Sequence, residues 1–123
     1  MAISLLSGKT VWGVPLGTTR DLVAAKIFLP LSVGSGTPNL GGAIVTAGSL
    51  VFIGAAMDDY LRAFDIESGR ELWKGRLPAG GQATPMTYRL PHGRQYVVIA
   101  AGGHGKMGTT RGDHLIAFAL PSR

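Results

Sequence analysis

One segment of the chain has the spacing of a nucleotide-binding loop. Residues 103–108 (GHGKMG) fit the pattern G-x-G-x-x-G and follow a segment expected to be a strand. In a dinucleotide-binding fold this loop must open a helix, because the free amides at the helix N-terminus hold the pyrophosphate. Residues 109–113 lead instead toward another strand-like segment, and Met107 stands where a P-loop needs Ser or Thr. The sequence therefore argues against dinucleotide binding and against a P-loop.

Metal-binding patterns are not evident in the sequence. Asp58 and Asp59 form a lone carboxylate pair in an expected turn, and His92, His104 and His114 are far apart along the chain. A metal site needs several such ligands close together. We therefore predict no metal ligand in this chain. We assign no role to His92, which lies in an expected turn, or to His114, which begins an expected strand.

Charge and composition limit the classes of partner. The chain of 123 residues has twelve Lys and Arg against seven Asp and Glu, a formal net charge of +5. These positive charges are scattered singly and do not alternate with aromatic residues, so we predict no nucleic-acid partner. Cysteine is absent, which excludes disulfides. No signal-peptide pattern opens the sequence and no apolar run approaches the ~20 residues of a membrane span, so we expect no targeting segment in this chain.

The elements that must position any functional side chain are expected to be strands and turns. The 19 Gly and 7 Pro disfavour long helices, while 46% hydrophobic and 15% charged residues argue against disorder. Four strands are predicted over residues 42–46, 50–54, 60–65 and 71–77. Three more are predicted over 83–88, 95–101 and 114–120, and residues 9–16 resemble the last strand of a preceding unit whose first three strands are missing.

An internal repeat indicates how these strands are arranged. Residues 7–12 (SGKTVW) recur as residues 68–73 (SGRELW), and residues 61–66 (LRAFDI) recur as 115–120 (LIAFAL). Repeats of about 40 to 60 residues built from short strands are typical of propeller blades or solenoids. We predict that Trp12 and Trp73 dock blade on blade, because an indole buries a large area and its N–H needs an acceptor. Spacing alone leaves a β-sandwich open.

The predicted fold class is all-β, a partial β-propeller with one complete four-stranded blade and two incomplete ones. This prediction divides the chain into four parts. They are 1–17 (last strand of a preceding blade), 18–39 (inter-blade connection), 40–77 (complete blade) and 78–123 (incomplete final blade).

Longer motifs resemble one family of propellers. Residues 63–73 (AFDIESGRELW) are similar to the tryptophan-docking motif of the quinoprotein dehydrogenases, eight-bladed propellers that bind pyrroloquinoline quinone (PQQ). Residues 37–42, 77–88 and 95–105 resemble the carboxyl end of the membrane-bound glucose and quinate dehydrogenase branch. The similarity covers nearly the whole chain but only about the last sixth of such an enzyme. It makes the fold an eight-bladed quinoprotein propeller, of which this chain is a fragment.

The resemblance implies cofactor-binding residues in two loops. The Pro-x-x-Gly-Gly stretch and the Gly-Gly-x-Gly loop carry over to Asn39, Leu40, Gly41, Gly42, His104 and Gly105. An apolar Leu40 beside two glycines suits a planar quinone, since glycine lets backbone come close. The His104 imidazole could donate a hydrogen bond or tune the pKa of a hydroxyl being oxidised. The alternative is a surface histidine in a flexible loop.

The resemblance also implies a function. It points to a dehydrogenase on the periplasmic side of the inner membrane that passes electrons from a sugar or polyol, through PQQ, to ubiquinone. The catalytic residue and the ligands of a calcium or magnesium ion belong to earlier blades, so no catalytic residue is predicted here and the fragment alone is expected to be inactive. Open strand edges predict self-association. The alternative functions are a non-catalytic propeller scaffold or interaction module, and a free-standing module that closes by self-association.

Overall fold

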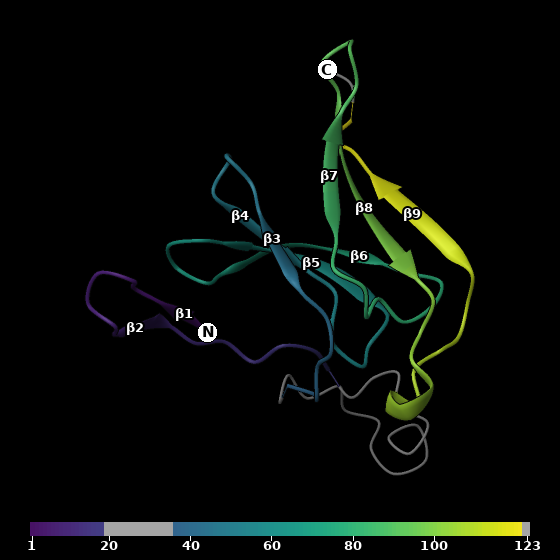
Figure 1. The fold of residues 1–123 in the computed structure, drawn as a ribbon, viewed down its shortest axis with the longest axis horizontal. Coiled ribbons are helices and arrows are strands. Elements are labelled where there is room, and N and C mark those ends of the chain that lie inside the picture. The colour runs from purple at the N-terminus through teal and green to yellow at the C-terminus, as the bar shows by residue number, and fades with distance from the viewer. Residues whose placement is uncertain (19–35, 122–123) are drawn as a thin grey trace.

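The computed structural model describes residues 1–18 and 36–121, which form three antiparallel sheets and one short helix (Figure 1). The predicted all-β class is confirmed. The strands are β1 (Ala2–Ile3), β2 (Thr10–Trp12), β3 (Ala43–Val45), β4 (Leu50–Ile53), β5 (Tyr60–Asp65), β6 (Glu71–Arg76), β7 (Met86–Arg89), β8 (Gln95–Ala101) and β9 (His114–Phe118), and the 3₁₀ helix is η2 (Gly105–Met107).

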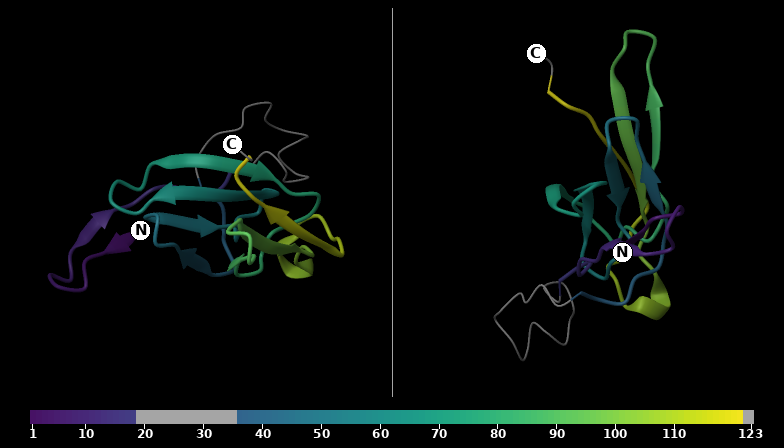
Figure 2. Two further views of the ribbon diagram at one scale, coloured as in Figure 1. Left: turned by 90° about the horizontal axis from the view of Figure 1, so that it is seen from above. Right: turned by 90° about the vertical axis from the view of Figure 1, so that its left-hand side faces the viewer.

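The middle sheet is the complete blade that the sequence predicted. Its four strands pair in the order β3-β4-β5-β6, each antiparallel to the next, and lie side by side in the left panel of Figure 2. The register places Phe52 opposite Ile44 and Ala63, and Ala63 opposite Trp73. These four side chains form one row across the sheet, on the face that packs toward the next blade.

The third sheet has three described strands, in the order β7-β8-β9, as predicted for an incomplete blade. Its first strand begins at Met86, three residues later than the pattern suggested. Pro85 explains the difference, because proline has no N–H to donate to a β ladder. Figure 1 shows this sheet diverging from the blade, so the two sheets enclose a wedge that opens away from η2.

The hydrophobic core fills the narrow end of this wedge. Leu61 and Leu77 of the blade pack with Ile99 of β8, and each is at most 2% exposed. Ala79 and Ala101 are fully buried in the same cluster, where their small side chains let the two sheets approach closely. The core therefore joins the second and third sheets near the loops that follow β8.

The N-terminal region differs from its prediction. Residues 9–16 were expected to be one strand without its neighbours, but β2 pairs with β1 in a hairpin. Gly13, Pro15 and Gly17 follow Trp12, and these residues end the ladder early.

The hairpin repeats the geometry of β5 and β6. Ala2 lies opposite Trp12 as Ala63 lies opposite Trp73, and each pair is followed by the same shift in register. The internal repeat therefore extends further toward the N-terminus than its sequence letters indicated. The domain boundaries at 17, 39 and 77 stay predictions, and residues 19–35 of the predicted connection lie outside the described part of the chain.

Candidate functional site

The six residues predicted to bind a cofactor lie in two loops at one end of the sheets. Residues 39–42 lead into β3, and His104 and Gly105 follow β8, where Gly105 begins η2. Both loops lie at the lower end of Figure 1, at the narrow side of the wedge. The antiparallel order explains this, because β3 begins and β8 ends on the same side of their sheets.

The first loop is held by backbone contacts with the segment after β4. The Leu40 N–H donates to the Ala55 carbonyl at 2.9 Å, while the Leu40 side chain stays 48% exposed. Gly41 has φ of +145°, and a Cβ there would lie 2.6 Å from the Gln82 carbonyl oxygen. Glycine is therefore required at position 41 for close packing against the Gln82 backbone, whereas Leu40 presents an apolar surface outward.

Ala55 connects this loop to the segment between β6 and β7. Ala55 is fully buried with φ of 54°, a left-handed conformation that costs free energy for any residue with a Cβ. Its N–H donates to the Gly81 carbonyl at 2.7 Å while its carbonyl accepts from Leu40. Two backbone hydrogen bonds therefore compensate for the strained conformation and fix the first loop to residues 80–82.

The Gln82 side chain continues the connection toward the second loop. Its Nε2 donates to the Ala56 carbonyl at 2.7 Å, and its Oε1 accepts from the Thr109 hydroxyl at 2.9 Å. Thr109 is 8% exposed, and its Oγ1 also accepts the backbone N–H of His104 at 2.8 Å. The two predicted loops are thus joined by one series of hydrogen bonds that runs through Gln82 and Thr109.

Backbone hydrogen bonds close the second loop onto the same segment. The Gly103 N–H donates to the Gly80 carbonyl, and the Gly80 N–H donates to the Thr110 carbonyl, both at 2.9 Å. Gly103 has φ of +69°, and a Cβ there would overlap the Thr110 carbonyl. The glycine before His104 therefore allows the two arms of the loop to meet.

His104 is half-buried, and one ring nitrogen of its imidazole is in an unusual environment. Its Nδ1 is enclosed and finds no hydrogen-bond partner among the described residues. A buried polar atom without a partner is rare in folded proteins and calls for an explanation such as a functional role. A surface histidine in a flexible loop would instead expose both ring nitrogens to water.

Asp58 and Asp59 do not form the lone pair that the sequence suggested. They lie in the bend before β5, but Asp58 is 1% and Asp59 4% exposed. Arg62 makes a bidentate ion pair with Asp58 at 2.6 and 2.8 Å, and Arg76 lies 3.5 Å from Asp59. Each carboxylate is therefore neutralised by an arginine of the blade, and burial without such pairing would be costly.

The arginine of the first pair has a raised pKa. Burial by itself lowers the pKa of Arg62, but the hydrogen bond and charge of Asp58, followed by those of Glu71, outweigh it. The Asp58 carboxylate also accepts the N–H and the hydroxyl of Thr18, at 2.7 and 3.0 Å. Asp59 accepts the Thr110 hydroxyl at 3.1 Å, so the ion pairs adjoin the second loop.

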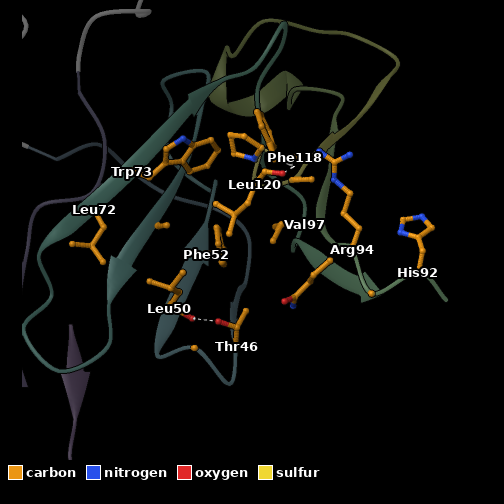
Figure 3. Close-up of a pocket in the computed structure, with 16 residues that line it drawn as sticks. Thr46, Leu50, Phe52, Leu72, Trp73, His92, Arg94, Val97, Phe118 and Leu120 are labelled. Atoms are coloured by element: carbon orange, nitrogen blue, oxygen red, sulfur yellow. Dashed lines mark hydrogen bonds between the residues drawn. The ribbon is translucent and has the colours of Figure 1, made fainter. Parts of the chain in front are cut away.

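A large apolar pocket lies at the opposite, open side of the wedge (Figure 3). It has a volume of about 1230 Å³, and none of the six predicted residues is among the described residues that line it. Figure 3 shows Trp73 and Phe118 side by side at this pocket, with Leu50 and Phe52 on the blade. The pocket is the space between the outer parts of two blades and is separate from the candidate site.

The sequence reasoning missed Gln82, Thr109 and Ala55. Gln82 lies inside one of the family-like segments, but nothing in its spacing identifies Thr109, 27 positions away, as its partner. Within residues 1–18 and 36–121, no three His, Asp or Glu side chains are placed to hold a metal ion. No helix among these residues is long and apolar enough to cross a membrane.

Known proteins with similar sequences include several dehydrogenases. Residues 1–97 match the PQQ family described as "Glucose/ethanol/alcohol dehydrogenase, beta-propeller domain". The chain is 54% identical over 119 residues to quinoprotein glucose dehydrogenase A of Acinetobacter calcoaceticus, covering 97% of this chain and 15% of that protein. It is 49% identical over 122 residues to a probable quinate dehydrogenase (quinone) of Xanthomonas campestris pv. juglandis, covering 98% of this chain and 15% of that protein.

A solved structure has a similar fold. The quinohemoprotein alcohol dehydrogenase from Comamonas testosteroni aligns with a TM-score of 0.57 and 29% identity, over 68% of this chain and 13% of that chain. The chain spans about 15% of the length of the curated relatives that it matches.

Proposed function

The chain belongs to the glucose/ethanol/alcohol dehydrogenase β-propeller family, and from this premise we propose that it forms the carboxyl-terminal part of a PQQ-dependent dehydrogenase. The observation that carries the proposal is 49–54% identity to glucose and quinate dehydrogenases over nearly the whole chain. The proposed substrate is accordingly a sugar or polyol of the glucose or quinate type.

The candidate site fits one side of a PQQ pocket. Leu40 presents an exposed apolar surface, and the Nδ1 of His104 has no hydrogen-bond partner within the described part of the chain. When bound, PQQ accepts the two electrons removed from the substrate. The residues that would line it are those of the two loops: Asn39, Leu40, Gly41, Gly42, His104 and Gly105.

His104 has the most specific role among these residues. His104 is half-buried, and its backbone N–H donates to Thr109, which fixes the loop that carries the imidazole. We assign the His104 imidazole a hydrogen bond to a polar group of the cofactor or to the substrate hydroxyl at the mouth of the site. A hydrogen bond of this kind orients the ligand.

The rest of the proposed enzyme lies in blades outside this chain. The catalytic carboxylate and the ligands of a calcium or magnesium ion belong there, so this chain alone is inactive. The complete enzyme passes electrons to ubiquinone on the periplasmic side of the inner membrane. Until it is part of a ring, the chain self-associates through its open strand edges, because an edge strand such as β9, which pairs only with β8 among the described strands, can template pairing with another strand.

A chimaera tests this proposal. The chain would replace the matching segment of the Acinetobacter calcoaceticus enzyme, and PQQ binding and dye-linked glucose oxidation would be measured. We expect the chimaera to bind PQQ and oxidise glucose, whereas the chain alone does neither. The change His104→Ala should weaken PQQ binding about tenfold, the effect of losing one good hydrogen bond.

The alternative functions make opposite predictions. A chimaera that unfolds cooperatively but neither binds PQQ nor oxidises glucose would favour a non-catalytic scaffold. A compact, cooperative monomer of the chain alone, seen by light scattering, would contradict self-association through open edges.

A further inference from the structure

We propose that Gln82 and Thr109 are positioning residues that hold His104 in place for the cofactor. The inference rests on the proposed function and adds two residues to which the sequence pattern gave no role. Neither residue belongs to the six that were predicted to bind the cofactor. Instead, Gln82 and Thr109 connect the loops to each other, and the hydroxyl of Thr109 accepts the N–H of His104 itself.

The directions of these hydrogen bonds allow one orientation of the Thr109 hydroxyl and of the Gln82 amide. A threonine hydroxyl has one proton, so when Oγ1 accepts from His104 its own proton is free to point at Gln82 Oε1. The amide nitrogen of Gln82 must then face the other way, toward the Ala56 carbonyl at 2.7 Å. Donors and acceptors therefore match at all three contacts. If the Gln82 amide were turned around, its oxygen would face the carbonyl oxygen of Ala56.

The pair also sets the separation of the two halves of the site. Ala56 follows Ala55, whose carbonyl accepts the Leu40 N–H, so the Gln82 side chain spans from the Leu40 loop to the His104 loop. Together with the backbone hydrogen bonds to Gly80 and Gly81, its length and that of the Thr109 side chain therefore help to set how far His104 lies from Leu40. Buried and fully hydrogen-bonded polar groups of this kind give a single geometry, which a ligand between the loops requires.

The His104 loop needs such a restraint. Gly103 and Gly108, with φ of +69° and +64°, bound the segment that carries the histidine, and glycines allow many backbone conformations. The 3₁₀ helix between them has no side-chain cap at its N-terminus. The contact with Thr109 is the side-chain hydrogen bond that holds the backbone of His104, so its loss should let the imidazole move.

The decisive comparison is Thr109→Val against Thr109→Ser in the chimaera. Valine keeps the shape but removes the hydroxyl, whereas serine keeps the hydroxyl and removes only a methyl group. We expect T109V to weaken PQQ binding, measured by fluorescence titration, about tenfold, and T109S to stay within about twofold of the unsubstituted protein. T109V should also lower kcat for glucose with KM unchanged. Without its hydrogen bond to Thr109, His104 is misplaced for the reaction, whereas substrate binding is affected less.

A matched control separates this effect from general destabilisation. Thr87 is an exposed threonine whose hydroxyl donates to the Tyr96 carbonyl at 2.8 Å within the β7–β8 pair. Thr87→Val removes a hydroxyl of the same kind away from the site, and PQQ binding should not change. If T109V does not accumulate, Gln82→Met removes the contacts of Gln82 with Thr109 and Ala56 while keeping the Thr109 hydroxyl, and it should also weaken PQQ binding.

The possible failures are distinguishable. If the unsubstituted chimaera does not bind PQQ, the proposed function fails and this inference fails with it. If the chimaera binds PQQ and His104→Ala weakens binding but T109V does not, the positioning role alone is wrong. Equal losses in T109V and T109S would also overturn it, because the hydroxyl would not be the group that matters.

Discussion

The two repeated tryptophans occupy equivalent positions but have different surroundings. The Trp12 indole N–H donates to the Ile66 carbonyl at 2.9 Å, and its ring lies against Gly69, where a Cβ would be 2.5 Å from the ring. Trp73 is 39% exposed, meets Phe118 edge to face with centroids 5.0 Å apart, and borders the apolar pocket of Figure 3. For Trp73, the described residues provide no hydrogen-bond acceptor.

The difference shows that a blade alone does not complete its own junction. Leu120 corresponds in the repeat to Ile66, yet its carbonyl accepts from Arg94 at 3.0 Å instead of from an indole. The junction between the blade and the third sheet is closed at its inner end by the core around Leu61 and Ile99. It is open where Trp73 lies. The turn of the following blade therefore stabilises Trp12 but not Trp73, as expected of a repeat protein whose units bury their faces against neighbours.

The largest predicted loss of stability concerns the buried ion pair of Arg62 and Asp58. This pair adjoins the junction between the N-terminal region and the blade. Arg62→Met leaves the Asp58 carboxylate buried without its main partner, which should lower the free energy of unfolding by about 3–5 kcal/mol. Arg70→Met is the control, because Arg70 is exposed and should change stability by less than about 0.5 kcal/mol. Urea unfolding followed by fluorescence measures both. Similar small losses would mean that the Asp58 cluster does not hold this junction.

The tryptophans themselves give the next effect. Trp12→Ala removes a docked ring and its hydrogen bond and should cost about 3 kcal/mol, the lower end of the range for a buried tryptophan because Trp12 is only half-buried. Trp73→Ala should cost about 1 kcal/mol, because its ring is partly exposed already. Unfolding followed by circular dichroism avoids dependence on the indole signal. Equal losses would contradict the difference between the two junctions.

The glycines of the two repeats provide a finer comparison. Gly8 and Gly69 have φ of +67° and +70°, so alanine is strained at either position by about 1–2 kcal/mol. A Cβ at Gly8 meets nothing within 4 Å, whereas a Cβ at Gly69 would press on Trp12. We expect Gly69→Ala to destabilise the chain by about 1–2 kcal/mol more than Gly8→Ala in urea unfolding. In a Trp12→Ala background this excess should disappear.

The sequence predicted the fold where local patterns and the repeat agree. The four strands of the blade have β-branched or aromatic residues between clear turns, so their positions could be read directly. It missed β1, because a strand of two residues at Ala2 and Ile3 has no readable alternation. Only the pairing of Ala2 with Trp12, which repeats that of Ala63 with Trp73, shows that it belongs to the motif.

The candidate site was predictable only in part. The resemblance selected the two loops, and the antiparallel order of the strands brings them to the same end. It did not identify Gln82 and Thr109, because their contact depends on how two loops fold against each other. The arginines that neutralise Asp58 and Asp59 were missed for the same reason, since charges scattered singly in the sequence are brought together by β5 and β6. The roles of the six predicted residues stay predictions.

The turns that follow β1 and β5 share a backbone hydrogen-bond pattern but differ in their first side chain, Ser4 in one and Asp65 in the other. Gly8 N–H donates to the Ser4 carbonyl at 2.8 Å, as Gly69 N–H donates to Asp65 at 2.9 Å. The side chains of Ser4 and Asp65 then accept from the residue three positions on, at 3.3 Å from Ser7 and at 2.7 Å from Ser68. One turn therefore contains a titratable group at a position where the other has a hydroxyl.

The smallest predicted effect is a pH response confined to one of these turns. Hydrogen bonds from the Ser68 hydroxyl and then from its N–H lower the pKa of Asp65 below its usual 3.8. The folded turn therefore favours the charged carboxylate, so its contribution to stability is present above pH 3.8 and is lost as the pH falls through the lowered pKa. The amide chemical shift of Ser68 should follow this titration between about pH 2 and pH 6, whereas that of Ser7 should not. Asp65→Ser should make both turns insensitive to pH, and an unchanged response in that variant would show that another group titrates.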